Sequence, residues 1–289
     1  MKQLLKEIGD WIEQGLVDAI VDSFTDMFKA INTQVGDVAA QIGQTPSDFK
    51  PSVFSMIKTL SDTVIIPIAG MILTFILCYE LINMIIERNN MHDFDTWIFF
   101  KWIFKTFCAT YILTNTFDIV MSVFELAQNV VNQSSGLISG SLDITNPVAL
   151  DTLRTQLEAM DMWVLLGLWM QINIVQISIW IMSICIFIIS YGRLIEIYMT
   201  ISVAPIPFAT MANREWGQMG NNYLKALFAL AFQAFLIMVC IAIYAVLVQD
   251  ITAADNIQLA IWGCAGYTAL LCFTLFKTGS ISKQLFGSS

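Results

Sequence analysis

Residues 64–86, VIIPIAGMILTFILCYELINMII, decide the fold class, because this long apolar run contains a single charged residue, Glu80. A helix of about 20 apolar residues is long enough to cross the hydrocarbon core of a bilayer. Four further runs of this kind follow, at residues 97–124, 162–191, 223–248 and 257–276. We therefore expect an all-α, polytopic membrane protein with about five transmembrane helices.

The composition of the 289 residues agrees with this class and excludes others. Hydrophobic residues make up 57% of the chain and charged residues only 13%, whereas about 25% of the residues of a soluble domain are charged. A soluble enzyme, a disordered regulator and a secreted disulfide scaffold are therefore excluded. The net charge of −9 also provides no diffuse positive field to hold nucleic acid.

A sixth apolar segment, residues 194–211, contains the interruption Ala204-Pro205-Ile206-Pro207. Proline lacks an amide donor and disfavours a helical residue before it, so a straight helix through Pro205 and Pro207 is not expected. Broken backbone at membrane depth is tolerated only where protein or a water-filled cavity surrounds it. We therefore predict a broken, membrane-embedded segment.

The distribution of basic residues predicts the topology. If residues 194–211 do not cross the membrane, most basic residues that flank the spans lie on one side, as the positive-inside rule requires of the cytoplasmic face. The outer face between spans then keeps only Arg154. This arrangement places the amino terminus outside and the carboxyl terminus in the cytoplasm of a cell-membrane protein.

The regions outside the spans complete the expected organisation. Residues 1–61 are an extracytoplasmic amphipathic helix, which reaches about residue 34 and suits a protein partner, followed by a linker. Residues 62–126 hold the first two spans, and residues 127–161 form an external loop. In this loop residues 134–141 are a flexible linker, and Asn146-Pro147 begins a short helix. Residues 162–289 hold three spans, the broken segment and a cytoplasmic tail.

The sequence contains no catalytic motif. It has no phosphate-binding loop, no dinucleotide fingerprint and no HExxH, and His92 is the only histidine. The six cysteines lie in apolar runs without CxxC spacing, which is typical of small buried hydrophobes. We therefore expect no catalytic, cofactor-binding or metal-binding residue, and no enzyme.

Charged residues within the apolar runs are the candidate functional residues, because a charge in a bilayer is costly and usually faces a partner or water. Glu80 lies about 9 Å from the cytoplasmic end of its span, at a depth similar to that of two lysines. An ion pair between Glu80 and one lysine is expected, with the other lysine extending to the interface; a polar lumen or proton path is the alternative. The full set of candidates is Glu80, Lys101, Lys105, Asp118, Glu125, Arg193 and Glu196.

The other charged candidates have simpler interpretations. Asp118 and Glu125 share a helix face near the outer end of the second span, which indicates an exposed mouth. Arg193 and Glu196 are three residues apart and can pair where the third span leaves the membrane, as an anchor.

The third span also carries a polar stripe. Such residues commonly connect helices by hydrogen bonds, and an uncharged lumen would need the same pattern; both interpretations stay open. The stripe consists of Asn173, Gln176, Ser183 and Ser190.

Several short stretches resemble one branch of the TrbL-like conjugal transfer proteins, which are related to the sixth VirB component of type IV secretion systems. The branch is found in integrative conjugative elements of Gram-positive bacteria. The resemblance extends from about residue 30 to about residue 280. The stretches are residues 43–46 (GQTP), 67–72 (PIAGMI), 78–82 (CYELI), 89–93 (NNMHD), 116–119 (TFDI) and 193–209, which ends in PIPFA.

This resemblance implies a membrane subunit of a DNA-transfer machine, with five spans, an outside amino terminus and a large external loop. It further implies a homo-oligomer that works with other secretion subunits, including separate ATPases, and that helps to pass single-stranded DNA with its relaxase. The family has no agreed catalytic residues, so none is carried over. Contact with DNA would be transient, and the alternative is a scaffold that never touches DNA.

Two other functions stay open from the sequence alone. A secondary transporter or ion-coupled permease would use broken helices near intramembrane charges, although no internal repeat is found. An assembly or immunity factor that only binds other membrane proteins is the third possibility.

Overall fold

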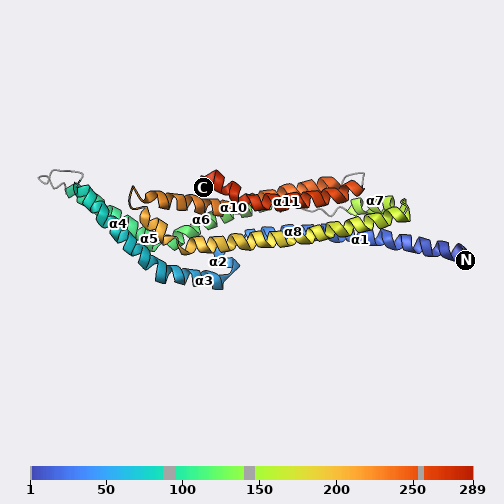
Figure 1. Cartoon of the computed structure of the whole chain (residues 1–289), viewed down its shortest axis with the longest axis horizontal. Helices are drawn as coiled ribbons and strands as arrows, with labels where there is room; N and C mark the ends of the chain where they lie inside the picture. Colours follow the sequence, from blue (N-terminus) through green and yellow to red (C-terminus); the bar gives the residue numbers. More distant parts are fainter. Residues whose placement is uncertain (1, 87–95, 140–146, 253–256, 289) are drawn as a thin grey trace. The chain divides into compact units, whose positions relative to one another are not determined.

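The computed structural model describes residues 2–86, 96–139, 147–252 and 257–288 (Figure 1), and the described residues contain no β-strand. Nearly all of the described residues are helical, which confirms the all-α fold class. The helices are α1 (Lys2–Ile42), α2 (Pro46–Phe49), α3 (Pro51–Leu60), the π-helix η1 (Ser61–Ile65), α4 (Ile66–Ile86), α5 (Thr96–Thr114), α6 (Thr116–Ser139), α7 (Pro147–Glu158), α8 (Met162–Ser202), α9 (Pro205–Thr210), α10 (Gly217–Thr252) and α11 (Ile257–Phe286).

Three helical stretches among the described residues are long and apolar enough to cross a membrane: Pro51–Ile86, Met162–Ser202 and Gly217–Val248. A fourth is possible if the bent pair Phe99–Thr114 and Thr116–Ser134 forms one span. The fifth expected span, residues 257–276, is helical as part of α11 but is not among these. The chain is therefore a polytopic helical protein with three or four spans on this criterion.

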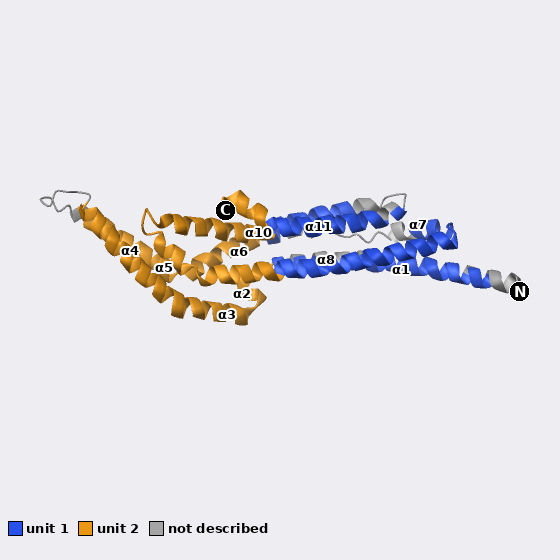
Figure 2. Cartoon of the chain, in the orientation of Figure 1, with its two compact units in different colours: residues 1–42, 131–190, 235–278 blue, residues 43–130, 191–234, 279–289 orange. Residues whose placement is uncertain are grey.

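The chain divides into two compact units, and neither is a continuous stretch of sequence (Figure 2). One consists of residues 1–42, 131–190 and 235–278, and the other of residues 43–130, 191–234 and 279–289. The helices α8, α10 and α11 each contribute residues to both units.

In the first unit, α1 buries its apolar face within the chain. Val17, Ile20, Phe24 and Met27 follow one another at steps of three and four residues, and all are at most 3% exposed. Helix α7 packs beside α1, and Arg154 of α7 forms an ion pair with Asp18 of α1. The part of this face between Val17 and Met27 is therefore covered by the chain itself, whereas Ile8, Trp11 and Ile12, earlier on the same helix, are exposed.

The structure differs from two expectations for the regions outside the spans. The amino-terminal helix extends beyond residue 34 and ends at Ile42, directly before Gly43. Residues 134–139 were expected in a flexible linker, but they continue α6. Helix formation propagates cheaply once a long helix exists, so a few serines and one glycine do not stop it. The short helix expected after Asn146-Pro147 is confirmed by α7, while residues 140–146 lie outside the described residues.

The second expected span is not straight, because the chain bends by 65° between α5 and α6. The bend coincides with Thr114, Asn115 and Thr116. All three side chains donate hydrogen bonds to carbonyls three or four residues earlier: the Asn115 amide and the Thr114 hydroxyl to Tyr111, and the Thr116 hydroxyl to Ile112. Side chains of this kind compete with the backbone ladder and bend helices.

The π-helix η1 lies one turn before Pro67. Proline provides no amide to the helix ladder and its ring crowds the carbonyl four residues earlier, so the preceding turn widens. The chain continues through this turn without a break, and α3, η1 and α4 form one continuous stretch.

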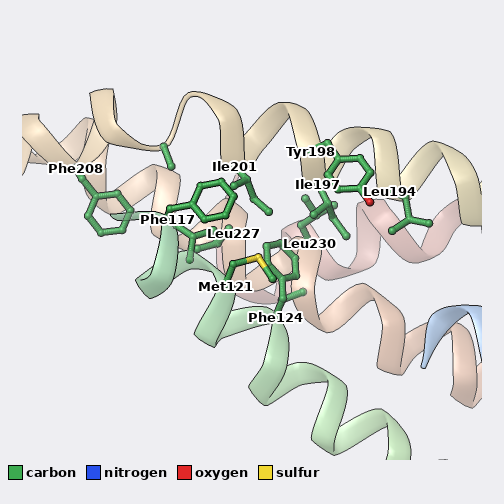
Figure 3. Close-up of a cluster of buried hydrophobic side chains, with 13 residues drawn as sticks. Phe117, Met121, Phe124, Leu194, Ile197, Tyr198, Ile201, Phe208, Leu227 and Leu230 are labelled. Atoms are coloured by element: carbon green, nitrogen blue, oxygen red, sulfur yellow. The ribbon is translucent and has the colours of Figure 1, made fainter. Parts of the chain in front are cut away.

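A buried apolar cluster joins α6, α8 and α10 in the second unit (Figure 3). Side chains from the three helices point toward one another, and Phe208 of α9 lies at the edge of the cluster. The main members are Phe117, Met121, Phe124, Leu194, Ile197, Tyr198, Ile201, Leu227 and Leu230. This cluster fixes the end of α8 and the start of α10, between which the broken segment lies.

Candidate functional site

The broken segment is shorter than the sequence predicted. Helix α8 continues to Ser202, so residues 194–202 belong to the third span and not to the interruption. The break begins at Val203, two residues before Pro205, and it contains only the six-residue helix α9 and the turns around it up to Trp216. Pro205 has no N–H for the carbonyl of Ile201, which accepts the N–H of Ala204 at 3.2 Å instead, so the effect of Pro205 reaches back only to the last turn of α8. We call residues 203–216 the re-entrant segment.

The re-entrant segment turns the chain back at one end of α8. The hydroxyl of Tyr223, near the start of α10, donates to the carbonyl oxygen of Thr200, near the end of α8, at 3.0 Å. A helix of six residues is about 9 Å long, whereas the hydrocarbon core is about 30 Å thick. The segment is therefore too short to cross a bilayer.

The re-entrant segment packs on α4 and α5. Ala209 and Ala212 from the segment are buried in one apolar cluster with Ala69 and Leu73 of α4 and Leu113 of α5. Most of these contacts are made by small or aliphatic side chains. The broken backbone thus lies against protein, as its position at membrane depth requires.

A polar cluster lies between the same three elements. The ammonium Nζ of Lys105 on α5 lies 2.5 Å from Oε1 of Glu80 on α4. The amide Nδ2 of Asn213, from the re-entrant segment, donates to Oε2 of Glu80 at 2.6 Å. The expected pair between Glu80 and a lysine is thus present, and the lysine is Lys105.

Asn213 also organises the start of α10. Its Oδ1 accepts the backbone N–H of Glu215 at 2.7 Å and, more weakly, that of Trp216 at 3.4 Å. Asparagine is a preferred residue in this role, because its carbonyl satisfies amides that the helix leaves free. Asn213 is 4% exposed. Both ends of its amide form hydrogen bonds: the nitrogen donates to Glu80, and the oxygen accepts from Glu215 and Trp216.

The second lysine of α5 lies outside this cluster. Lys101 is exposed, and its Nζ lies 5.8 Å from the ring centroid of Trp97, a cation–π contact on its own helix. A neighbouring contact joins α5 to α4 independently of charge: the indole N–H of Trp102 donates to the Leu77 carbonyl at 3.1 Å.

The predicted pair of Arg193 with Glu196 is replaced by a longer-range pair. The carboxylate of Glu196 lies 3.1 Å from Nζ of Lys283 in α11. Arg193 is half-buried, and its Nε is buried without a hydrogen-bond partner. Glu196 therefore connects α8 to the carboxyl-terminal turns of α11. The residue before Lys283, Ser282, donates a hydrogen bond from its hydroxyl to the carbonyl oxygen of Ala229 in α10.

The remaining candidates are not brought together. Asp118 and Glu125 are both exposed on α6, and Asp118 lies in its first turn, where a carboxylate complements the helix dipole. In the polar stripe, Gln176 reaches the Ser23 carbonyl of α1 at 3.4 Å. Asn173 bonds to the carbonyl of Trp169 in its own helix. Ser183 is half-buried and Ser190 is 5% exposed. Gln176 thus supports the helix-connecting interpretation of the stripe.

Sequence reasoning missed Asn213 and Lys283. An available signal for Asn213 was its position a few residues before a predicted helix, where asparagine commonly caps. No local pattern indicated that its free amide would reach Glu80, 133 residues earlier. Lys283 likewise lies 87 residues from its partner Glu196.

The arrangement suits holding a segment of chain. The polar cluster offers one carboxylate, one ammonium and one amide, and each is engaged by another member. Within the described ranges, no group of three or more histidine, cysteine, aspartate or glutamate side chains could hold a metal ion. The six cysteines are all free thiols.

Comparison with known proteins identifies the family of the chain. No curated protein and no solved structure matches the chain. One family model does match, described as TrbL/VirB6 plasmid conjugal transfer like protein, over residues 31–205. The match covers more than half of the chain and includes Glu80, Lys105 and all of α8. The chain therefore belongs to the TrbL/VirB6-like conjugal transfer family and is a membrane component of a conjugal transfer system.

Proposed function

We propose that this protein is a subunit of a conjugative type IV secretion apparatus that helps to form the translocation platform or channel for single-stranded DNA and its relaxase. Membership of the TrbL/VirB6-like family supports the apparatus. The several apolar helices support a position in the membrane. The finer role rests on the re-entrant segment.

The observation that carries this role is the broken backbone seated on α4 and α5 beside the Glu80–Lys105–Asn213 cluster. A subunit that only fills a bilayer needs no interrupted helix, since continuous helices satisfy every backbone group at lower cost. Interrupted helices near intramembrane charges are typical of membrane proteins that move a polar substrate.

The negative net charge is compatible with DNA passage. A route that bound a polyanion tightly would retain it, because each neutralised phosphate adds to affinity. With a charge of −9, this subunit would let the strand pass, and other subunits would contribute the positive charge that attracts it.

The proposal includes five further expectations. The system is an integrative conjugative element of a Gram-positive bacterium, and the chain forms a homo-oligomer in its cell membrane. The amino terminus lies outside and the carboxyl terminus in the cytoplasm, as the basic residues favour. Separate ATPases supply the energy, and the subunit itself is not an enzyme.

The test of the role is the double variant Pro205→Ala/Pro207→Ala in a mating donor. Removing both prolines allows a continuous helix to form across the break. We expect the protein to reach the membrane in normal amounts and the frequency of DNA transfer to fall about tenfold or more, a change equivalent to about 1.4 kcal/mol. Normal transfer by a correctly inserted variant would contradict a role for the break.

A second experiment asks whether DNA touches the subunit. Donor cells are cross-linked during mating, the chain is recovered, and the transferred strand is amplified from it. Recovery that depends on the partner ATPases supports the channel. Abolished mating without recovered DNA supports a scaffold, and normal mating without the gene would contradict the proposal as a whole.

A further inference from the structure

The Glu80–Lys105–Asn213 cluster joins the re-entrant segment to two helices by a single side-chain contact. Asn213 is the member that belongs to the segment, and its Nδ2 lies 2.6 Å from Oε2 of Glu80. The other carboxylate oxygen of Glu80 is already occupied by Lys105. The polar contact between the re-entrant segment and Glu80 thus depends on one charge-assisted hydrogen bond.

Breaking this contact would affect its two members differently. Glu80 would keep its ion pair with Lys105, and its side chain is 20% exposed, so water can replace the amide. Asn213 is only 4% exposed, and its Nδ2 would lose the hydrogen bond to Glu80, although its Oδ1 would keep the N–H groups of Glu215 and Trp216. A buried polar group that loses its partner is costly, so this contact favours the seated position of the segment.

Apolar contacts surround this hydrogen bond on both sides. Toward α4 the segment buries Ala209 and Ala212, and its Trp216 ring lies 6.1 Å from the ring of Phe75. Toward α10 the fit is tight, since a Cβ at Gly220 would lie 2.0 Å from Cγ of Met211 and 2.7 Å from the carbonyl oxygen of Pro207. The Glu80–Asn213 hydrogen bond thus adds a directional polar contact to an apolar seat.

We propose that the Glu80–Asn213 hydrogen bond is a clasp that keeps the re-entrant segment seated on α4 and α5, and that the loss of this bond lets the segment move enough to expose Ala212. The hinges are the turn at Val203-Ala204 and the turn at residues 211–216, where the helices are interrupted. This inference rests on the proposed function only for the biological purpose of the movement. The contacts of Glu80 with Asn213 and Lys105 do not depend on what the subunit transports.

The decisive variant is Asn213→Asp in the full-length chain. An aspartate keeps the oxygen that accepts the N–H groups of Glu215 and Trp216, but it replaces the donor that faces Glu80 with a second carboxylate. Like charges at this distance repel, so the clasp opens while the start of α10 is preserved. The matched rescue is Glu80→Gln/Asn213→Asp, which exchanges donor and acceptor: the new amide nitrogen at position 80 donates to the new carboxylate at position 213, and Lys105 keeps the amide oxygen at position 80 as an acceptor.

The readout is the rate at which a small maleimide modifies Ala212→Cys. Ala212 is 8% exposed in the seated segment, and the tryptic peptide 194–214 that carries it contains no native cysteine. Protein recovered from membranes is labelled, and that peptide is quantified by mass spectrometry. We expect Asn213→Asp to raise the rate about tenfold and the double variant to return it to within about twofold of the starting rate.

Lys101→Gln is the control, because it removes a charge from α5 outside the clasp, and it should leave the rate unchanged. An unchanged rate of maleimide modification in Asn213→Asp would overturn the clasp. A raised rate that the additional change Glu80→Gln does not reverse would also overturn it. Mating frequency is measured on the same strains. Normal mating after deletion of the whole gene would overturn the proposed function and leave the labelling result intact, so the two failures are distinguishable.

Discussion

At the scale of single residues, the site depends on side chains that are small or that have two polar ends. Asn213 uses one end of its amide for α10 and the other for Glu80. Gly220 leaves room for Met211 and for the Pro207 carbonyl. Lys105 and Lys101 show that two lysines one turn apart can have different roles, because only Lys105 reaches a carboxylate on another helix.

Gly220→Ala should destabilise the protein. The added methyl meets a flexible methionine and, at 2.7 Å, the backbone carbonyl of Pro207, which can move only with the segment. Overpacking of this kind costs about 1–3 kcal/mol, so we expect a lower Tm for the purified protein in detergent. Gly266→Ala is the control, since no atom lies within 4 Å of that position in α11; its Tm should stay the same or rise slightly. Equal Tm values for the two variants would contradict the tight seat at Gly220.

Lys105→Met should destabilise the protein more than Lys101→Met. The first change leaves Glu80 without its cation, with only Asn213 to balance the charge. Both partners are partly exposed, so the loss should be about 1–2 kcal/mol, below that of a fully buried pair. Lys101 contacts only a ring on its own helix, and its loss should cost about 0.5 kcal/mol or less. Thermal unfolding of both variants measures the difference, and a larger loss in Lys101→Met would show that the pair contributes little.

At the scale of elements, interruptions decide what long apolar runs become. The bend at Asn115, the π-helix before Pro67 and the break at Pro205 each follow from residues that remove or compete for a backbone hydrogen bond. Elsewhere the helices run on, and α1 and α8 each extend well beyond their predicted ends. The amphipathic pattern of α1 was also predicted; its part from Val17 to Met27 is covered inside the chain, while Ile8, Trp11 and Ile12 are exposed.

Phe24→Ala should weaken the first unit, because this α1 side chain is 3% exposed. Truncating a buried phenylalanine costs about 3–5 kcal/mol, so protease resistance and Tm should both fall. The matched control is Trp11→Ala on the same helix, whose side chain is 76% exposed; it should leave both measurements unchanged. If Trp11→Ala were the more damaging change, the packing of α1 in this unit would be wrong.

At the scale of the whole molecule, the turn at the re-entrant segment constrains the topology. The end of α8 and the start of α10 lie together, as the hydrogen bond between Tyr223 and Thr200 shows. Under the proposed function, in which both helices span the membrane, the loop before α8 and the residues after α10 are expected on one side. This agrees with the near absence of basic residues from both stretches, of which only the first contains one, Arg154.

Cysteine labelling in intact cells tests that orientation. An impermeant maleimide should modify Ala159→Cys, an exposed position just before α8, without permeabilisation. It should modify Gln284→Cys, exposed near the end of α11, only after the cells are permeabilised. The difference follows from an external loop and a cytoplasmic carboxyl terminus. The reverse pattern would invert the topology, and modification of both sites in intact cells would place them on the same side.

The sequence by itself determined the helical membrane class, the break at Pro205 and an ion pair between Glu80 and a lysine, whereas it did not predict the bend at Asn115 or the π-helix before Pro67. Each follows from local chemistry: the length of apolar runs, the missing amide of proline, and the cost of a lone charge in hydrocarbon. The tertiary structure alone decided which lysine pairs with Glu80, that Asn213 joins them, and that Glu196 pairs with Lys283 and not with Arg193. These contacts connect residues up to 133 positions apart, and helix periodicity carries no information about which faces of distant helices meet.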